Sequence, residues 1–247
     1  MSGESSVANA RMADGIAKQK LHVMLLVDTS RSMQGERIRQ VNKSIEDIHK
    51  YLTDLQTENS NVDFYMSIMT FANDASFVPG YKGVNVSQMT PPTLKAIGYS
   101  NLHRAYEELE PLLRKESDGG IMPDFGGLAP IILLLTDGHP TKECSRQLEM
   151  LKKRPWFKVA LKYGIAIALD DERTVRVLTD FTEDKDCVIK CLDSADLAKI
   201  IQVIVLTASK VKSQSGAANA GKHGESMTLN IKQQIQSSLD EIDETEW

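Results

Sequence analysis

Three short polar segments of the sequence carry side chains that could hold a metal ion. The first is DTSRS after the apolar run HVMLLV, the second is GYSNL before a helical pattern, and the third is TDG at the end of IILLLT. A hard divalent cation requires oxygen ligands in a near-octahedral array, and Mg²⁺ keeps several of its waters. Carboxylates would supply charge, and hydroxyls would supply small neutral ligands. The segments therefore predict a site for Mg²⁺, with Mn²⁺ or Ca²⁺ as alternatives, built from Asp28, Ser30, Ser32, Ser100 and Asp137.

Each of these segments also has an ordinary structural interpretation. Asp-x-Ser between a strand and a helix is usually an N-capping turn, and a lone Asp-Gly after a strand is usually only a turn. Ser100 is likewise a plausible helix N-cap. The metal site is favoured because all three segments occur together and are expected at the carboxyl ends of strands. On a tight loop, Ser30 and Ser32 can both turn inward while Thr29 and Arg31 point away.

The strands that must position these residues are predicted from apolar patterning. Continuous apolar runs indicate strands buried on both faces, and an alternating run indicates a half-buried strand. Strands are expected at residues 22–27, 62–71, 131–136, 163–169 and 187–191, with a short edge strand and turn within 77–86.

Apolar residues that recur every three or four positions predict the helices between these strands. The expected helices cover residues 36–55, 102–113, 142–162, 174–181 and 197–205. Pro111 is expected to kink or divide the second helix, and Pro155 to interrupt the third. Residues 94–97 are expected to form a short element, and residues 117–130 a long loop rich in Gly and Pro.

The alternation of strands and helices determines the predicted fold class. It requires parallel pairing through right-handed crossovers. We therefore predict an α/β fold with a doubly wound, mostly parallel, Rossmann-like sheet that has helices on both faces. Ligands of such sheets bind beyond the carboxyl ends of the strands, near the topological switch point. The candidate metal residues are expected at this edge.

Composition changes toward both ends of the chain indicate the domain organisation. Residues 1–19 are expected to form a flexible leader, residues 20–208 the folded domain, residues 209–225 a linker and residues 226–247 an amphipathic helix. The apolar stripe of this last helix consists of Ile231, Ile235, Leu239 and Ile242. We expect the stripe to dock on its own domain or in the groove of a partner.

Charge and cysteine content limit the classes of partner and the compartment. The net charge of −5 argues against nucleic acid, which requires clustered Lys and Arg. The three cysteines do not have the spacing of a disulfide framework or a zinc site. The N-terminus lacks the apolar core of a signal peptide, and no apolar stretch has the length of a membrane span. These features predict a cytoplasmic protein that binds neither nucleic acid nor membrane.

The three segments together resemble a known family. LLVDTSRSMQGERI, GYSNLHRAYEEL and ILLLTDGHPTKE are similar to the three metal-site segments of von Willebrand factor A-type domains, over roughly residues 21–208. The resemblance implies that Ser30, Ser32 and Ser100 bind the metal directly, and that the two aspartates bind it directly or through water. It also implies an open coordination position that an acidic residue of a partner protein fills. The family usually has Thr at the position of Ser100 and often Gly at that of Arg31.

Within this family, the chain resembles the bacterial TerY-like branch that is associated with tellurite resistance. The similar segments are VNKSIEDIHKYL, IMTFAND and LTDGHPT, with His139 where that branch usually has Glu. The resemblance implies an adaptor in a bacterial stress-response or signalling assembly, with a protein kinase and a PP2C-type phosphatase as partners.

Two other functions use similar sequence features. The same domain occurs in regulatory subunits of metal chelatases and AAA+ ATPase complexes, although this chain has no P-loop of its own. A haloacid-dehalogenase-like phosphatase also places Asp after its first strand, but it needs a carboxylate two residues later as the general acid, and Ser30 stands there. We therefore predict a binding protein and not an enzyme.

Overall fold

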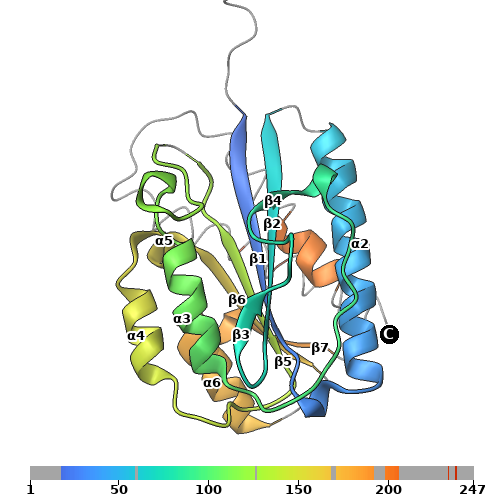
Figure 1. Ribbon diagram of the computed structural model, residues 1–247, viewed down its shortest axis with the longest axis vertical. Helices are drawn as coiled ribbons and strands as arrows, with labels where there is room; N and C mark the ends of the chain where they lie inside the picture. Colours follow the sequence, from blue (N-terminus) through green and yellow to red (C-terminus); the bar gives the residue numbers. More distant parts are fainter. Residues whose placement is uncertain are drawn as a thin grey trace, which may run out of the picture.

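A seven-stranded sheet forms the centre of the computed structural model (Figure 1), which describes residues 18–58, 61–125, 127–167, 171–191 and 198–205, together with Gln233 and Ser237. The strands are β1 (Gln19–Asp28), β2 (Val62–Phe71), β3 (Ala75–Phe77), β4 (Val84–Asn85), β5 (Ile131–Thr136), β6 (Leu161–Ile167) and β7 (Val188–Cys191). Their order is β3-β2-β1-β5-β6-β7, and β4 also pairs with β2. The long strands all pair in parallel, and only β3 and β4 run antiparallel to their neighbour. The predicted mostly parallel sheet is confirmed.

Helices cover both faces of this sheet, as predicted. Helix α2 (Glu36–Glu58) and residues 198–205, which are also helical, pack on one face. The other face is covered by α3 (Leu102–Leu112), α4 (Ser145–Lys152), α5 (Pro155–Val159) and α6 (Glu172–Thr182). Among the described residues, none of the helices has both the length and the apolar character that crossing a membrane requires.

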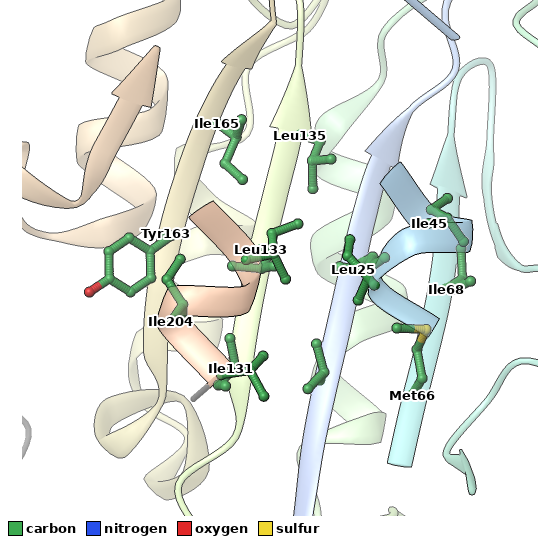
Figure 2. Packing of buried hydrophobic residues seen from close by; sticks show 14 of the residues in the cluster. Leu25, Ile45, Met66, Ile68, Ile131, Leu133, Leu135, Tyr163, Ile165 and Ile204 are labelled. Carbon is green, nitrogen blue, oxygen red and sulfur yellow. The ribbon is translucent and has the colours of Figure 1, made fainter. Parts of the chain in front are cut away.

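Two apolar clusters, one on each face, hold the sheet between the helices. Strand β1 contributes to both clusters, because successive side chains of a strand point to opposite faces. Leu25 packs in the cluster that also contains Ile45 of α2 and Ile204 (Figure 2), whereas Leu26 packs in the opposite cluster. Every side chain of β5 is buried, which explains the continuous apolar run in its sequence.

Helix α2 has the apolar stripe that the sequence predicts. Ile38, Val41, Ile45, Ile48 and Leu52 are all buried, and they lie three or four residues apart. Leu55 packs against the same cluster while remaining partly exposed. The prediction of a helix at residues 36–55 is therefore confirmed, with a further turn at its carboxyl end.

The interruption predicted at Pro155 is confirmed, whereas Pro111 does not divide its helix. Pro111 is the next-to-last residue of α3, so the one amide hydrogen bond that it cannot make lies in the last turn. The segment predicted at residues 142–162 forms two helices, α4 and α5, on either side of the break, and its last two residues belong to β6. Pro155 lies in the first turn of α5, where a missing amide proton costs nothing.

The connection from β4 to α3 also differs from the prediction. Residues 94–97 form no helix or strand. The segment runs along α2 toward the carboxyl edge of the sheet (Figure 1), and the Asn42 side chain bonds both backbone groups of Leu94, at 2.7 and 3.0 Å. These two bonds satisfy backbone groups that would otherwise need a regular element.

The remaining predicted elements are found close to their expected positions. The edge strand and turn expected within residues 77–86 are two short strands, β3 and β4, joined by a turn. The long loop at residues 117–130 contains the end of a short 3₁₀ helix, Glu116–Asp118. The predicted leader up to residue 17, the linker and the C-terminal helix lie outside the described residues, apart from Gln233 and Ser237, and they stay predictions.

Candidate metal centre

The sheet brings all five predicted site residues to one edge. Strands β1 and β5 are parallel neighbours, with Val27 paired to Leu135, so Asp28, one residue later, and Asp137, two residues later, leave the sheet at the same edge. Asp28 is the last residue of β1 and Asp137 immediately follows β5. This edge is the topological switch point, because the chain leaves β1 toward β2 on one side and later enters β5 on the other.

Asp28 is buried and accepts hydrogen bonds from three neutral groups. Its Oδ1 atom accepts from the backbone amide of Ser30 at 2.8 Å. Its Oδ2 atom accepts from the Ser100 hydroxyl at 2.9 Å and from the Thr136 hydroxyl at 2.7 Å. Burial raises the pKa of the Asp28 carboxyl, and these hydrogen bonds oppose that increase. A cation at this site would favour the ionised carboxylate that burial disfavours.

The second half of the site joins the two serines to Asp137. The Ser30 and Ser32 hydroxyl oxygens are 3.1 Å apart, and the Ser32 hydroxyl donates to Asp137 Oδ1 at 2.7 Å. Arg37, the second residue of α2, donates to Asp137 Oδ2 at 2.6 Å and to the Ser32 carbonyl at 3.1 Å. Asp137 therefore has a positively charged partner, whereas the hydrogen-bond donors to Asp28 are neutral.

The spacing of these oxygens suits an octahedral cation. Neighbouring ligands of Mg²⁺, each about 2.05 Å from the ion, lie roughly 2.9 Å from one another. The contacts from Ser30 to Ser32, from Ser32 to Asp137 and from Ser100 to Asp28 measure 3.1, 2.7 and 2.9 Å. The described part of the chain has no group of three His, Cys, Asp or Glu side chains that could hold a metal. A cation here would therefore use hydroxyl oxygens beside the two carboxylates.

Backbone hydrogen bonds hold the loop that contains Ser100 against the site. The amide of Ile97 donates to the Thr29 carbonyl at 2.7 Å, and the amide of Arg31 donates to the Gly98 carbonyl at 2.9 Å. The amide of Thr141, after β5, donates to the Ser100 carbonyl at 2.7 Å. The three segments predicted from the sequence are thus joined to one another through their backbones.

Gly98 allows this loop to approach its neighbours closely. Its φ angle is +97°, and a Cβ atom at this position would lie 2.8 Å from the side chain of Asn73. Asn73 in turn accepts the Tyr99 amide at 2.9 Å. This loop, which the backbone hydrogen bonds hold in place, exposes two large hydrophobic side chains: Ile97 is 73% exposed and Tyr99 is 69% exposed.

Two residues of the site were not predicted from the sequence. Thr136 could have been noticed as a hydroxyl residue at the end of a buried strand. Arg37 gave no local signal, because it precedes Asp137 by 100 positions. Arg31, which the sequence predicts to point away from the site, is exposed on the 3₁₀ helix Arg31–Met33.

The chain is similar in sequence to a segment of much larger curated proteins. It is 28% identical over 161 residues to inter-alpha-trypsin inhibitor heavy chain H1 of Bos taurus, and the match covers 59% of this chain and 16% of that protein. The H1 heavy chain of Sus scrofa is also 28% identical, over 160 residues. The chain thus matches a small part of these relatives.

Solved structures share the fold at low sequence identity. The ArnB paralog VWA2 from Sulfolobus acidocaldarius has a TM-score of 0.51 and 21% identity, and the match covers 74% of this chain and 44% of that one. The vWF domain of the type V pili tip protein Mfa5 from Porphyromonas gingivalis has a TM-score of 0.57 and 10% identity, and covers 83% and 99% of the two chains.

A match to a protein-family model identifies the family of this chain, which the individual similarities do not. The model of the von Willebrand factor type A domain matches residues 22–203, a range that contains all five predicted metal residues. The fold similarity to the vWF domain of Mfa5 agrees with this assignment. The chain belongs to the von Willebrand factor type A domain family.

Proposed function

We propose that this domain holds a divalent cation, Mg²⁺ in preference to Mn²⁺ or Ca²⁺, and uses it to bind a partner protein. Von Willebrand factor type A domains typically mediate protein–protein interaction or adhesion. The observation that carries the proposal is the oxygen cluster at the carboxyl edge of the sheet, with contacts of 2.7–3.1 Å between its members. The proposed ligands, directly or through water, are Asp28, Ser30, Ser32, Ser100 and Asp137.

The partner would supply an acidic side chain to the cation. Two carboxylates and three hydroxyls can leave one position of an octahedral ion to a ligand from outside. Ile97 and Tyr99 are exposed beside the proposed ligand Ser100, and an exposed apolar pair on a fixed loop favours contact with another apolar surface. We therefore expect the partner to present an Asp or Glu flanked by apolar side chains.

The biological setting is proposed from the sequence resemblance to the TerY-like branch. On that basis the chain is an adaptor in a bacterial stress-response or signalling assembly, it acts in the cytoplasm, and its partners are a protein kinase and a PP2C-type phosphatase. Regulation of a chelatase or AAA+ complex is the second candidate, and it differs in requiring a separate ATPase chain.

A binding experiment with defined partners tests this proposal. The purified chain is immobilised, and the kinase, the phosphatase and an AAA+ ATPase of the source organism are passed over it in Mg²⁺ and in EDTA. We expect the kinase or the phosphatase to bind in Mg²⁺ and to dissociate in EDTA. Equal binding in both buffers would contradict a role for the cation, and Mg²⁺-dependent binding of the ATPase alone would favour the second candidate.

Two matched variants test the apolar contact. Ile97→Ser removes an exposed apolar side chain beside the site, whereas Phe125→Ser removes one that is 93% exposed in the loop leading to the opposite end of β5. We expect Ile97→Ser to weaken binding of the partner about tenfold and Phe125→Ser to leave it unchanged. Equal effects of the two variants would show that the apolar rim has no special role.

We also propose that the site binds and does not catalyse. The described oxygen cluster contains hydroxyls and two carboxylates, and Ser30 occupies the position at which a phosphatase of the alternative class needs its general acid. The chain should therefore not hydrolyse p-nitrophenyl phosphate in Mg²⁺. Turnover that disappears in Asp28→Asn would overturn the binding proposal.

A further inference from the structure

The ion pair between Arg37 and Asp137 connects helix α2 directly to the candidate metal centre. The side chain of Asp137 is 0% exposed, and that of Arg37 is 33% exposed. Of the ion pairs in the described residues, this is the one whose carboxylate is completely buried. The second hydrogen bond of Arg37, to the carbonyl of Ser32 at 3.1 Å, places the guanidinium over the loop that carries both serines.

The buried site needs positive charge even when it contains no metal. Asp28 and Asp137 lie in one network: Asp28 accepts from the Ser30 amide, the Ser30 hydroxyl contacts the Ser32 hydroxyl, and the Ser32 hydroxyl donates to Asp137. Burial of two ionised carboxylates is costly unless a cation compensates for them. Among the described residues, the cation that forms an ion pair with either carboxylate is Arg37.

A metal ion and a guanidinium would compete for the same carboxylate. Both oxygens of Asp137 already accept a hydrogen bond, one from Ser32 and the other from Arg37. Like charges repel, so a fixed guanidinium disfavours a divalent cation beside it. At a separation of about 5 Å, even the dielectric constant of water gives a weakening of about tenfold in affinity.

We infer that Arg37 is a built-in counter-cation of the metal site. It holds Asp137 in position in the metal-free protein, and it lowers the affinity of the site for a divalent cation. The second half of this inference depends on the proposed function, whereas the first half concerns the metal-free protein alone. Arg37 is in this sense a positioning residue that also sets the cation concentration at which the site fills.

The position of Arg37 in the chain explains how it can have this role. Helix α2 begins at Glu36, three residues after the 3₁₀ helix that contains Ser32, so an arginine in the first turn can reach back over the loop. Arg39, two residues later, is 73% exposed and pairs with Glu36 on the same helix. Arg39 therefore provides a control of the same residue type on the same turn that does not contact the site.

The test compares Arg37→Met with Arg39→Met in the full chain. Methionine keeps much of the apolar stem and removes the charge in both variants. Melting temperatures are measured in EDTA, and Mg²⁺ affinity is measured by isothermal titration calorimetry. We expect Arg37→Met to melt about 5–10 °C lower in EDTA, because a buried carboxylate loses its partner. We also expect its Kd for Mg²⁺ to fall about tenfold, while Arg39→Met changes neither quantity.

A third variant keeps the test informative if Arg37→Met does not fold in EDTA. Arg37→Lys retains the positive charge, but it replaces the guanidinium, whose Nη1 atom makes both contacts, with a compact and more strongly hydrated ammonium group. It should lie between wild type and Arg37→Met in both melting temperature and Mg²⁺ affinity. Refolding of Arg37→Met on addition of Mg²⁺ would also support the inference, because the metal would then replace the missing charge.

The outcomes separate this inference from the proposed metal site. If wild type binds Mg²⁺ and the Arg37 variants bind it equally or more weakly, the counter-cation is excluded while the metal site stands. If only Arg37→Met binds Mg²⁺, the inference is supported and the native site is shown to be closed by Arg37. If neither wild type nor any Arg37 variant binds Mg²⁺, both the competition and the proposed function are overturned.

Discussion

Strand β1 has a buried ionisable side chain near each end, and the two side chains differ in whether they have hydrogen-bond partners. His22, near the start of the strand, is 3% exposed, and neither ring nitrogen has a hydrogen-bond partner among the described residues. Its ring stacks on Tyr65 with centroids 5.2 Å apart. Asp28, at the other end, accepts hydrogen bonds from one amide and two hydroxyls.

This difference shows that His22 has a packing role, whereas Asp28 has donors that stabilise a negative charge. Burial lowers the pKa of His22 to about 4, with a smaller contribution from nearby Lys20, so the ring stays neutral near pH 7 and behaves as a flat apolar group. Asp28 lies in a network of oriented donors that neither packing nor a simple turn requires. At the carboxyl edge of the sheet, Asp28, Ser30, Ser100 and Asp137 are buried together, as the proposed metal site requires.

The largest effect is expected from removal of the carboxylates. Asp28→Ala leaves the Ser30 amide and the Ser100 hydroxyl without their acceptor, while the Thr136 hydroxyl can still donate to the Gly138 carbonyl; in EDTA the variant should destabilise the fold by about 3–5 kcal/mol. Asp137→Ala should cost less in EDTA, because Arg37 is partly exposed and water can solvate it. Both variants should lose the Mg²⁺-dependent increase in melting temperature, since that increase requires binding to the folded state. An undiminished increase in both would place the cation elsewhere.

A pH-dependent effect of about 3 kcal/mol is expected at the other end of β1. The folded protein lowers the pKa of His22 from 6.5 to about 4, so the unfolded chain binds more protons between these values. Stability from this group is present above pH 6.5 and is lost as the pH falls toward 4. His22→Phe keeps a ring against Tyr65 and cannot titrate, so chemical denaturation at pH 7 and pH 4 should show a smaller loss for the variant. Identical losses would mean that His22 is not neutral and buried in solution.

A smaller effect is expected at the loop beside the centre. Gly98→Ala places a methyl group 2.8 Å from Asn73 in a backbone conformation that favours glycine, and should cost about 2 kcal/mol. It should also weaken Mg²⁺ binding, because the same loop carries Ser100. Gly80→Ala is the control, since its φ angle is +83° and its Cβ would meet nothing within 4 Å. If the two variants bind Mg²⁺ equally, the close approach at Gly98 does not position the site.

The smallest effect is expected from exchange of one hydroxyl residue for another. Ser100→Thr keeps the hydroxyl that donates to Asp28 and should change the Mg²⁺ affinity by less than about twofold. Ser100→Ala removes the hydroxyl and should weaken the affinity markedly. Isothermal titration calorimetry of the three proteins distinguishes these cases, and equal affinities of Ser100→Ala and wild type would exclude Ser100 as a ligand.

The sequence by itself determined the elements whose burial pattern is local. The run at residues 131–135 is entirely apolar because β5 is covered on both faces, and the stripe of α2 repeats because one side of the helix packs on the sheet. Four of the five proposed ligands were found in the same way, because Asp28, Ser30, Ser32 and Asp137 follow recognisable apolar runs, whereas Ser100 precedes a helical pattern. Local patterns located the break at Pro155 but placed the end of the helical segment too late, because residues 161 and 162 belong to β6.

Only the tertiary structure decided which distant side chains meet at the site. The contacts of Thr136 with Asp28 and of Arg37 with Asp137 span 108 and 100 positions in the chain. They depend on the parallel register of β1 and β5 and on the direction in which α2 leaves the loop, and neither is encoded in a short pattern. The sequence thus predicted the proposed oxygen ligands, whereas the fold revealed the positive charge that pairs with Asp137. The physical reason is that apolar periodicity reports burial, while charge pairing depends on the spatial arrangement of elements far apart in sequence.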